Sequence, residues 1–372
     1  MKISPERLVS TFLQLVKIDG TSRCEKEVKN FIFDHFKDYV LTIHEDNSGD
    51  LVYGNCGNLI MKIRGTNQSV PTVILSAHMD TISSTKNLEP ICSNGKITSD
   101  GNTILGADNR LGVAIICEVL RSLQENKEKF GNIEVVFSIC EEIGLLGIKC
   151  FDFSQLKGKY AYVLDSGNTT EGTLINQSPS AMRFSIDVIG KAAHAGIAPE
   201  NGINAISIAS KAITKIPQGK INPETTLNIG FIEGGKATNI VPENVTIKGE
   251  IRSYHDRNID KQWSKIQSVF SKQTEVDNGR VEFTGQKDYQ GFYIEPDSEI
   301  IRFAQTASSQ PLVIQSSFGG SDANVFNQNG IPAVVLGTGS WEPHTNDEYV
   351  LVEEISRAAQ WIYDIILAPM KK

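Results

Sequence analysis

Four apolar runs constrain the fold of this chain more than any other feature of its sequence. Each run is short, is rich in strand-forming residues and ends in polar or glycine-containing sequence, and helical patterns such as residues 111–124 alternate with them. Near-continuous apolar strands that alternate with helices are typical of a mostly parallel sheet, because helices then cover both faces. We therefore expect an α/β fold with a mostly parallel sheet and helices on both faces. The four runs are residues 72–77, 133–140, 160–164 and 331–336.

The middle of the chain has a different pattern. Strand-like and helical segments follow one another there in the order β-α-β-β-α-β, which is the ferredoxin-like arrangement. These segments are residues 183–189, 203–216, 225–232, 245–253, 261–272 and 281–284. We interpret residues 177–290 as a ferredoxin-like domain that is inserted into an α/β domain comprising residues 1–176 and 291–372.

The composition excludes several classes of protein. Hydrophobic residues make up 40% of the chain and charged residues 22%, which argues against a disordered, collagen-like or coiled-coil chain. The net charge of −8 disfavours nucleic-acid partners and anionic membrane surfaces. No apolar stretch approaches the roughly 18 residues of a membrane span, and residues 1–16 do not resemble a signal peptide. The six cysteines form no CxxC pair and lie mostly in apolar runs, so we expect reduced thiols in a cytoplasmic protein.

Side chains that commonly bind metal ions follow the ends of the predicted strands. Because ligands bind outside the carboxyl ends of the strands in an open α/β sheet, these side chains are expected to converge. A further acidic residue precedes the helical segment that starts near Arg110. The candidates are His78 and Asp80 after the first run, Glu141 and Glu142 after the second, Asp165 after the third, His344 after the fourth, and Asp108 before the helix.

Each of these residues has a simpler explanation when it is taken alone. A single aspartate at a strand end is usually a turn or helix-cap residue, adjacent glutamates are usually solvated, and a loop histidine such as His344 is usually a surface residue. His78 and Asp80 are harder to explain in this way. Residues i and i+2 of a strand share a face, so the carboxylate can hydrogen-bond the imidazole and fix its tautomer. The common position of the whole set at one end of the sheet favours a metal site.

Charge balance favours two divalent metal ions over one. Three carboxylates and two neutral imidazoles carry three negative charges, which two divalent cations and one hydroxide neutralise. A nitrogen and oxygen set without thiolate suits Zn²⁺, with Mn²⁺ or Co²⁺ as alternatives, and argues against a structural zinc site. Glu141 and Glu142 are neighbours with diverging side chains, so one can bind metal while the other acts as general base.

Five short segments carry these candidates: His78-Met79-Asp80, Gly106-Ala107-Asp108-Asn109, Glu141-Glu142-Ile143-Gly144, Asp165 and Pro343-His344. Together they resemble the co-catalytic dizinc metallopeptidase family that contains peptidase T, carnosinase-type dipeptidases and the desuccinylases. The resemblance covers essentially the whole chain, because residues 190–196 and 234–239 resemble the lid motifs of that family and residues 319–322 resemble a substrate-facing loop. Among these branches, the peptidase T-like aminotripeptidases are the most similar.

The resemblance implies a role for each candidate in the first domain. His78, Asp108 and Asp165 would hold one metal ion, and Asp108 would bridge to a second one held with Glu142 and His344. A cis peptide bond is implied after Asp108. Two further residues are implied to be catalytic: Asp80 would orient His78, and Glu141 would take a proton from the bridging water and pass it to the leaving amine.

The inserted domain is implied to be a lid that contributes substrate contacts. His194, Asn239 and Arg252 would supply contacts to the oxyanion and to the substrate carboxylate, and Gly320 and Ser321 would face the substrate. Whether His194 serves its own site or that of a partner subunit is left open. A homodimer through the lid domain is likewise left open, although such dimers are common among relatives.

The function that these implications favour is a metal-dependent exopeptidase that removes the N-terminal residue of a short peptide, as tripeptidases do. An N-acyl amino-acid deacylase or a dipeptidase would use the same metal chemistry and stays an alternative. A third hypothesis is a catalytically silent binding protein on the same scaffold. The intact set of candidate ligands and the presence of Glu141 argue against this third hypothesis.

Overall fold

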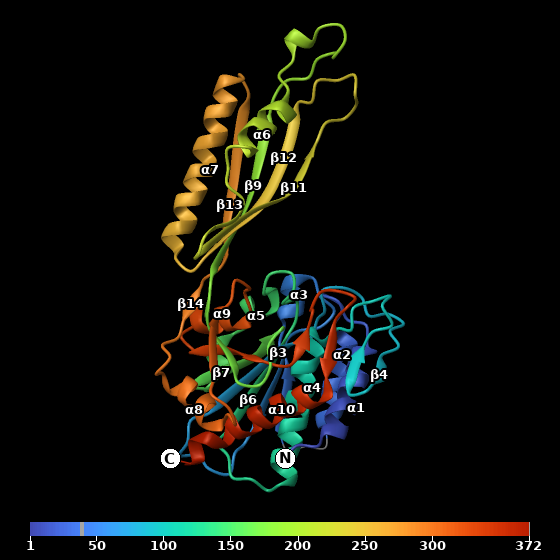
Figure 1. Ribbon diagram of the computed structural model, residues 1–372, viewed down its shortest axis with the longest axis vertical. Coiled ribbons are helices and arrows are strands. Elements are labelled where there is room, and N and C mark those ends of the chain that lie inside the picture. The colour runs from blue at the N-terminus through green and yellow to red at the C-terminus, as the bar shows by residue number, and fades with distance from the viewer. Residues whose placement is uncertain (38–40, 372) are drawn as a thin grey trace. The chain divides into compact units, whose positions relative to one another are not determined.

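The computed structural model describes residues 1–37 and 41–371, which group into two compact units (Figure 1). The first unit contains Met1–Gln177, Tyr293–Ser316 and Ser321–Lys372, and the second contains Ser178–Phe292 and Ser317–Gly320. Residues 317–320 therefore group with the second unit, whereas the sequence analysis assigned them to the first domain. The boundaries of the inserted domain, at 176/177 and 290/291, stay predictions.

A nine-stranded sheet forms the centre of the first unit. The four predicted apolar runs are its neighbouring central strands β6, β3, β7 and β16, which are parallel to one another. Antiparallel pairs extend the sheet on either side, with β1 and β2 beside β6 and with β8 beside β16. The strands in order are β1 (Leu41–Glu45), β2 (Leu59–Ile63), β6 (Ile133–Ser138), β3 (Val73–His78), β7 (Tyr160–Ser166), β16 (Ala333–Gly337), β8 (Thr173–Ser178) and β14 (Phe292–Tyr293), with β15 (Val313–Ser316) also paired to β8.

Helices cover both faces of this sheet, as predicted. Tyr162 and Leu164 of β7 belong to the hydrophobic core that includes Leu111 of α4, whereas the alternate residues Ala161 and Val163 point to the opposite face. α4 packs on β3 and β7 together with α1 and α10, and α9 packs on β7 and β16. The helices of the unit are α1 (Pro5–Val16), α2 (Lys26–Phe36), α3 (Ser48–Val52), α4 (Ala107–Glu125), α5 (Leu146–Lys149), α8 (Glu299–Ala307), α9 (Asp322–Gln328) and α10 (Val352–Leu367), with short 3₁₀ helices at Phe153–Gln155 and Ala368–Lys371.

A small antiparallel sheet in the first unit joins residues 91–98 to residues 340–351. Its order is β17 (Ser340–Trp341), β18 (Tyr349–Leu351), β5 (Lys96–Thr98) and β4 (Ile91–Ser93). Tyr349 pairs with both Trp341 and Thr98, so the connection between β17 and β18 is held at a fixed place beside the 96–98 strand. This connection contains His344.

The second unit has the predicted β-α-β-β-α-β order, with one additional strand. Its antiparallel sheet has the order β10-β11-β12-β9-β13, and α6 and α7 share a core with it that includes Val188, Ile247 and Phe270. The elements are β9 (Ser180–Ile189), a 3₁₀ helix at Pro199–Asn201, α6 (Ala205–Ile213), β10 (Gly219–Asn222), β11 (Thr225–Gly234), β12 (Asn244–Ser253), α7 (Asp256–Val276) and β13 (Arg280–Tyr289). The unit is therefore ferredoxin-like with β10 added at one edge.

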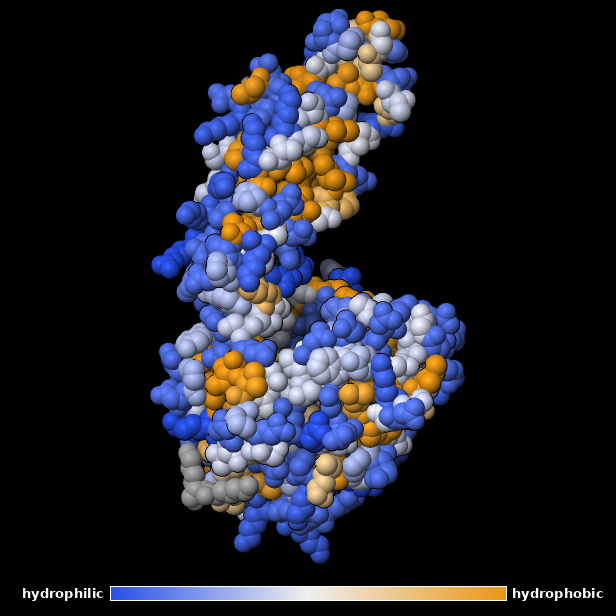
Figure 2. Space-filling model, in the orientation of Figure 1, coloured by the Kyte–Doolittle hydropathy of each residue, from blue (hydrophilic) through white to orange (hydrophobic). Residues whose placement is uncertain are grey.

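The surface of the first unit that Figure 2 shows is mostly polar, with scattered apolar side chains. No described helix is both long enough and apolar enough to cross a bilayer. All six cysteines are free thiols, which agrees with the expectation of reduced cysteines.

Candidate metal centre and catalytic site

The candidate ligands of the first unit lie where neighbouring parallel strands end. His78 is the last residue of β3, Asp165 is next to the last residue of β7, and Glu142 follows β6. Asp108 lies in the first turn of α4, and His344 lies in the connection from β17 to β18. The parallel order of β6, β3 and β7 therefore brings their carboxyl ends, and the ligands that follow them, to one edge of the sheet.

The Asp108 carboxylate lies between two histidines, with one oxygen directed to each. His78 Nε2 is 3.1 Å from Asp108 Oδ1 and 3.4 Å from Asp165 Oδ1. His344 Nε2 is 3.2 Å from Asp108 Oδ2 and also 3.2 Å from Glu142 Oε1. The structure thus brings together all five side chains that the sequence suggested as metal ligands. The Asp108-Asn109 peptide bond is cis, as the resemblance implied.

These residues fit a divalent metal ion. One ligand atom each from His78, Asp108 and Glu142 lie within 4.8 Å of one another, and imidazole with carboxylate is a donor set that Zn²⁺, Mn²⁺ and Co²⁺ accept. Glu142 Oε1 is buried, and it contacts His344 Nε2 at 3.2 Å. A buried carboxylate whose contact is a half-exposed histidine is only partly compensated, so a cation at this position would stabilise it further.

Three carboxyl groups of the site, those of Glu141, Asp165 and Asp108, have pKa values shifted from their ordinary range in the metal-free chain. Burial raises the pKa of Glu141 well above its usual value, and the nearby carboxylates of Asp165 and Asp322 raise it further. Burial also raises the pKa of Asp165 to about 7. Asp108 behaves differently: burial opposes its ionisation, but hydrogen bonds with His344 and His78 hold its pKa below the ordinary value. The cluster thus holds excess negative charge that cations would relieve.

Asp80 holds three segments of the site in place. Its main-chain oxygen is 3.0 Å from His78 Nδ1, and its carboxylate Oδ1 is 3.3 Å from the same nitrogen. The carboxylate also accepts hydrogen bonds from the backbone N–H groups of Glu141 and Glu142, at 3.1 and 3.2 Å, and from Ser22 Oγ at 2.6 Å. The contact with His78 was predicted from the sequence, whereas Ser22 and the support that Asp80 gives to the two glutamates were not.

Two of the predicted substrate contacts in the second unit are neighbours. The Ala195 N–H donates to the Asn239 carbonyl at 2.9 Å, so the loops carrying His194 and Asn239 are joined. His194 is exposed, and its Nδ1 accepts the N–H groups of Gly196 and Ile197 at 3.2 Å each. Because Nδ1 is an acceptor, the neutral imidazole carries its proton on Nε2 and presents a donor to solvent.

Arg252 lies at the other end of β12 and is already engaged by its own chain. Its Nε and Nη2 donate to the two carboxylate oxygens of Glu250, at 3.0 Å each, and its Nη1 donates to the Phe318 carbonyl at 3.1 Å. Arg252 pairs in register with Ala181 of β9, whereas the opposite end of β12 leads to Asn239. The structure therefore does not bring Arg252 together with His194 and Asn239 within one unit.

The chain is similar to known peptidases over most of its length. Family models match residues 176–278 as a peptidase dimerisation domain and residues 58–197 as peptidase family M28. Peptidase T of Clostridium perfringens is 30% identical over 288 residues, which cover 73% of this chain and 67% of that protein. The chain belongs to the peptidase T family. Among the solved structures matched, aminopeptidase PepT from Bacillus cereus has 36% identity and a TM-score of 0.91, and a tripeptidase from Staphylococcus aureus has 34% identity and a TM-score of 0.95, each with 100% coverage of both chains.

Membership of the peptidase T family makes the chain a metallopeptidase. The ligand cluster is therefore the candidate for its metal site. The cluster combines candidate metal ligands with Glu141, a buried carboxyl group next to one of them. A group with this position and a raised pKa is suited to exchange a proton during hydrolysis. The arrangement can therefore combine a metal site with a general base.

Gly320 and Ser321, predicted to face substrate, also have structural roles in this peptidase T family member. A Cβ atom at Gly320 would lie 2.4 Å from the ring of Tyr289, so only glycine fits there without a shift. Ser321 is the N-cap of α9, since its Oγ accepts the Ala323 N–H at 3.3 Å and its own N–H donates to Asn324 Oδ1 at 3.1 Å. A substrate role for both residues stays a prediction.

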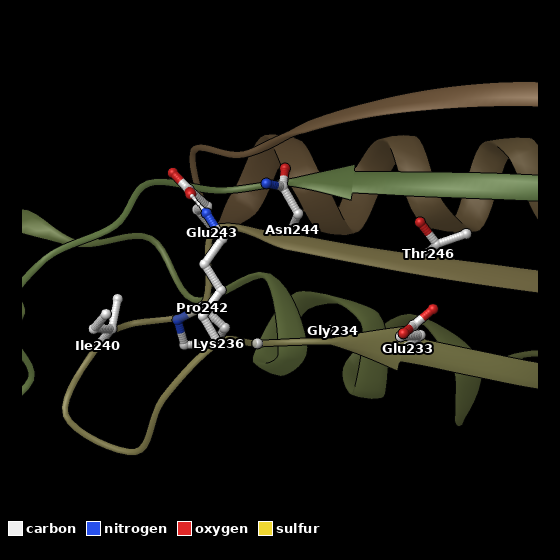
Figure 3. A pocket seen from close by; sticks show the side chains of 9 residues that line it. Glu233, Gly234, Lys236, Ile240, Pro242, Glu243, Asn244 and Thr246 are labelled. Atoms are coloured by element: carbon white, nitrogen blue, oxygen red, sulfur yellow. Dashed lines mark hydrogen bonds and ion pairs between the residues drawn. The ribbon is translucent and has the colours of Figure 1, made fainter.

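A cavity of about 190 Å³ lies in the second unit, and its lining includes Ile240, the residue that follows Asn239 (Figure 3). Figure 3 shows Lys236 and Glu243 directed toward each other, and their Nζ and Oε1 are 2.7 Å apart. The pairing with Glu243 lowers the net charge that this lysine could offer to a substrate carboxylate. The cavity residues are Glu233, Gly234, Gly235, Lys236, Ile240, Pro242, Glu243, Asn244 and Thr246.

Proposed function

We propose that this member of the peptidase T family is a zinc-dependent aminopeptidase that releases the N-terminal residue of tripeptides. The observation that carries the proposal is the position of the Asp108 carboxylate between His78 and His344, with Asp165 and Glu142 completing the cluster. The solved relatives described as an aminopeptidase and a tripeptidase support this activity.

His78, Asp108 and Asp165 would hold one metal ion, and Asp108, Glu142 and His344 would hold the other. When bound, the ions would polarise the scissile carbonyl and activate water for attack. Glu141 would accept a proton from the attacking water and deliver it to the amine that leaves. Asp80 supports this step because it binds the backbone N–H groups of Glu141 and Glu142 and thereby fixes the base relative to its neighbouring ligand.

Arg252 would bind the C-terminal carboxylate of the peptide. Glu250 occupies the side of the guanidinium formed by Nε and Nη2. A substrate carboxylate would therefore approach the end formed by Nη1 and Nη2, where a planar guanidinium can also bind two oxygens, and it would share Nη1 with the Phe318 carbonyl or displace that carbonyl. Binding at this end would select peptides by length, since the scissile bond must reach the metal ions at the same time.

His194 would serve the active site of a second copy of the chain. Arg252 lies eight residues past Asn244 (252 − 244 = 8), or about 27 Å along β12 at roughly 3.4 Å per residue. The loop of His194 begins at the Asn244 end, where the Gly190 N–H donates to the Glu243 carbonyl at 2.7 Å. An extended tripeptide spans only about 10 Å. His194 and Arg252 of one copy therefore cannot both contact one tripeptide, which supports a homodimer.

The match to a peptidase dimerisation domain and the exposed apolar residues of the second unit also support the homodimer. Ile206 of α6 and Phe231 and Ile232 of β11 are exposed, and Figure 2 shows apolar side chains gathered on the visible face of this unit. A mixture of two inactive variants, His194→Ala and Glu141→Gln, tests the arrangement. Partial recovery of activity on mixing is expected, because the His194→Ala chain would receive His194 from its partner. Mixed dimers without recovery would show that His194 acts within its own chain.

We also propose that the enzyme works in the cytoplasm. Six free thiols suit a reducing compartment, where disulfides seldom form.

The activity is tested by an assay of purified protein that has been treated with a chelator and then supplied with Zn²⁺, Mn²⁺ or Co²⁺. We expect release of the N-terminal residue from tripeptides, with Zn²⁺ supporting turnover. N-acetyl amino acids and dipeptides serve as comparison substrates. Preferred turnover of N-acetyl amino acids would overturn the proposal in favour of a deacylase, and the absence of any turnover would favour a binding protein.

A further inference from the structure

Glu348 is a buried carboxylate that contacts the segment carrying Asp108. Its side chain is fully buried, its Oε2 accepts the Gly106 N–H at 2.6 Å and its Oε1 accepts the Asp108 N–H at 3.0 Å. These N–H groups lie at the start of α4, where backbone donors have no partner within the helix. Glu348 therefore caps α4 from a distant part of the chain.

The same residue belongs to the segment that carries His344. Both lie in the connection between β17 and β18, and Tyr349, which follows Glu348, is fixed by its pairing with Thr98. The Glu348 N–H also donates to the Thr345 carbonyl at 3.2 Å, which closes the turn after His344. Glu348 consequently joins the two segments that supply Asp108 and His344.

Burying this carboxyl group costs free energy. None of the ion pairs among the described residues includes Glu348, and an ionised carboxylate in an apolar environment requires compensation. The two N–H groups and the positive end of the α4 dipole supply part of it. A helix could be capped at lower cost by a serine or an asparagine of its own segment.

We infer that Glu348 is a positioning residue that sets the direction of the Asp108 carboxylate relative to His344. The inference rests on the proposed metal centre, in which Asp108 and His344 bind a common ion. The Glu348 carboxylate binds the backbone N–H of Asp108 and not its side chain. Glu348 can therefore fix the backbone of Asp108 while the Asp108 carboxylate stays available to a metal ion. Partners outside the ligand set typically change metal affinity by about 10–100-fold when they are removed.

Binding of Co²⁺ to metal-free protein tests the inference, with calorimetry for affinity and the visible absorption bands for ligand geometry. We expect Glu348→Gln to weaken Co²⁺ binding about 10–100-fold and to change the bands, because the amide supplies only one acceptor. Glu348→Asp keeps the charge and both acceptors but is shorter, so a smaller loss is expected. If Glu348→Gln does not fold, Co²⁺ binding by Glu348→Asp provides the test.

Glu134→Gln is the matched control. Glu134 is also buried and accepts two backbone N–H groups, from Lys157 and Gly158 at 2.8 Å each, but both donate to Oε2, Lys62 Nζ lies 3.7 Å from Oε1, and the residue is not in the ligand cluster. The Glu134→Gln substitution should lower the melting temperature and leave Co²⁺ binding unchanged. Wild-type Co²⁺ binding in a Glu348 variant, or equal losses in the Glu348 and Glu134 variants, would overturn the positioning role. If the wild-type protein bound no Co²⁺, the proposed metal centre itself would be wrong.

Discussion

Arg252 and Glu250 lie on one face of β12 and form a two-pronged ion pair, with Nε–Oε1 and Nη2–Oε2 distances of 3.0 Å. The pair holds the guanidinium in one orientation before any substrate is bound. It also means that the free charge available to a substrate is smaller than that of an isolated arginine.

Arg252→Leu should raise KM for a free-acid tripeptide by about 10–100-fold, the range expected for a lost hydrogen bond to a charged group. The effect should shrink sharply for the corresponding tripeptide amide, which has no terminal carboxylate. Steady-state kinetics on the two substrates provide the measurement. Equal losses on acid and amide would show that Arg252 has a structural role or contacts another part of the substrate.

Glu141→Gln should remove most of the turnover while both metal ions stay bound. The side chain is next to the candidate ligand Glu142 but is assigned as the base, and removal of a general base typically costs about 10²–10⁴-fold in rate. Elemental analysis of the purified variant beside the wild-type protein gives the metal content. Loss of an ion together with activity would mean that Glu141 is itself a ligand and that the roles of the two glutamates are reversed.

Asp80→Asn should lower both metal affinity and kcat by about 10–100-fold. The amide can accept from one of the Glu141 and Glu142 N–H groups but would place its NH₂ group against the other. Ser22→Ala removes only one donor to Asp80 and should have a smaller effect in the same direction. If Ser22→Ala were as damaging as Asp80→Asn, the contacts with the glutamate backbone would not be the important ones.

The metal-free protein should lose stability as the pH rises above neutrality. Hydrogen bonds with Asp108 and Glu142 raise the pKa of His344 to about 10, from an ordinary value near 6.5. A raised pKa means that the stabilisation is fully present below about pH 6.5 and is lost as the pH rises toward 10. Melting temperatures of chelator-treated wild type and His344→Gln between pH 6 and 10 should converge with rising pH. Parallel curves would show that His344 is not protonated in the metal-free chain.

The fold of the first unit was predictable because its central strands are buried on both faces. Residues 133–138 and 73–78 therefore appear as continuous apolar runs, and the residues after them fall at one edge by geometry alone. The edge strands β1 and β2 and the small sheet around β18 left no comparable signal. Their positions depend on pairings such as Tyr349 with Thr98, which join segments far apart in the sequence.

The candidate metal ligands were predictable from the sequence, but the residues that support them were not. His78 and Asp108 were recognisable because metal chemistry restricts residue type. Glu348 was not, since an acidic residue in a polar loop is ordinarily solvated, and only its tertiary contacts with Gly106 and Asp108 distinguish it. Ser22 was missed for the same reason.

The central claim is that the cluster around Asp108 binds two metal ions that the reaction requires. Titration of metal-free protein with Zn²⁺, with tripeptide hydrolysis measured at each addition, tests it most directly. The account predicts no hydrolysis without metal and a plateau of activity at two ions per chain. Full activity in the metal-free protein, or a plateau at one ion, would contradict it.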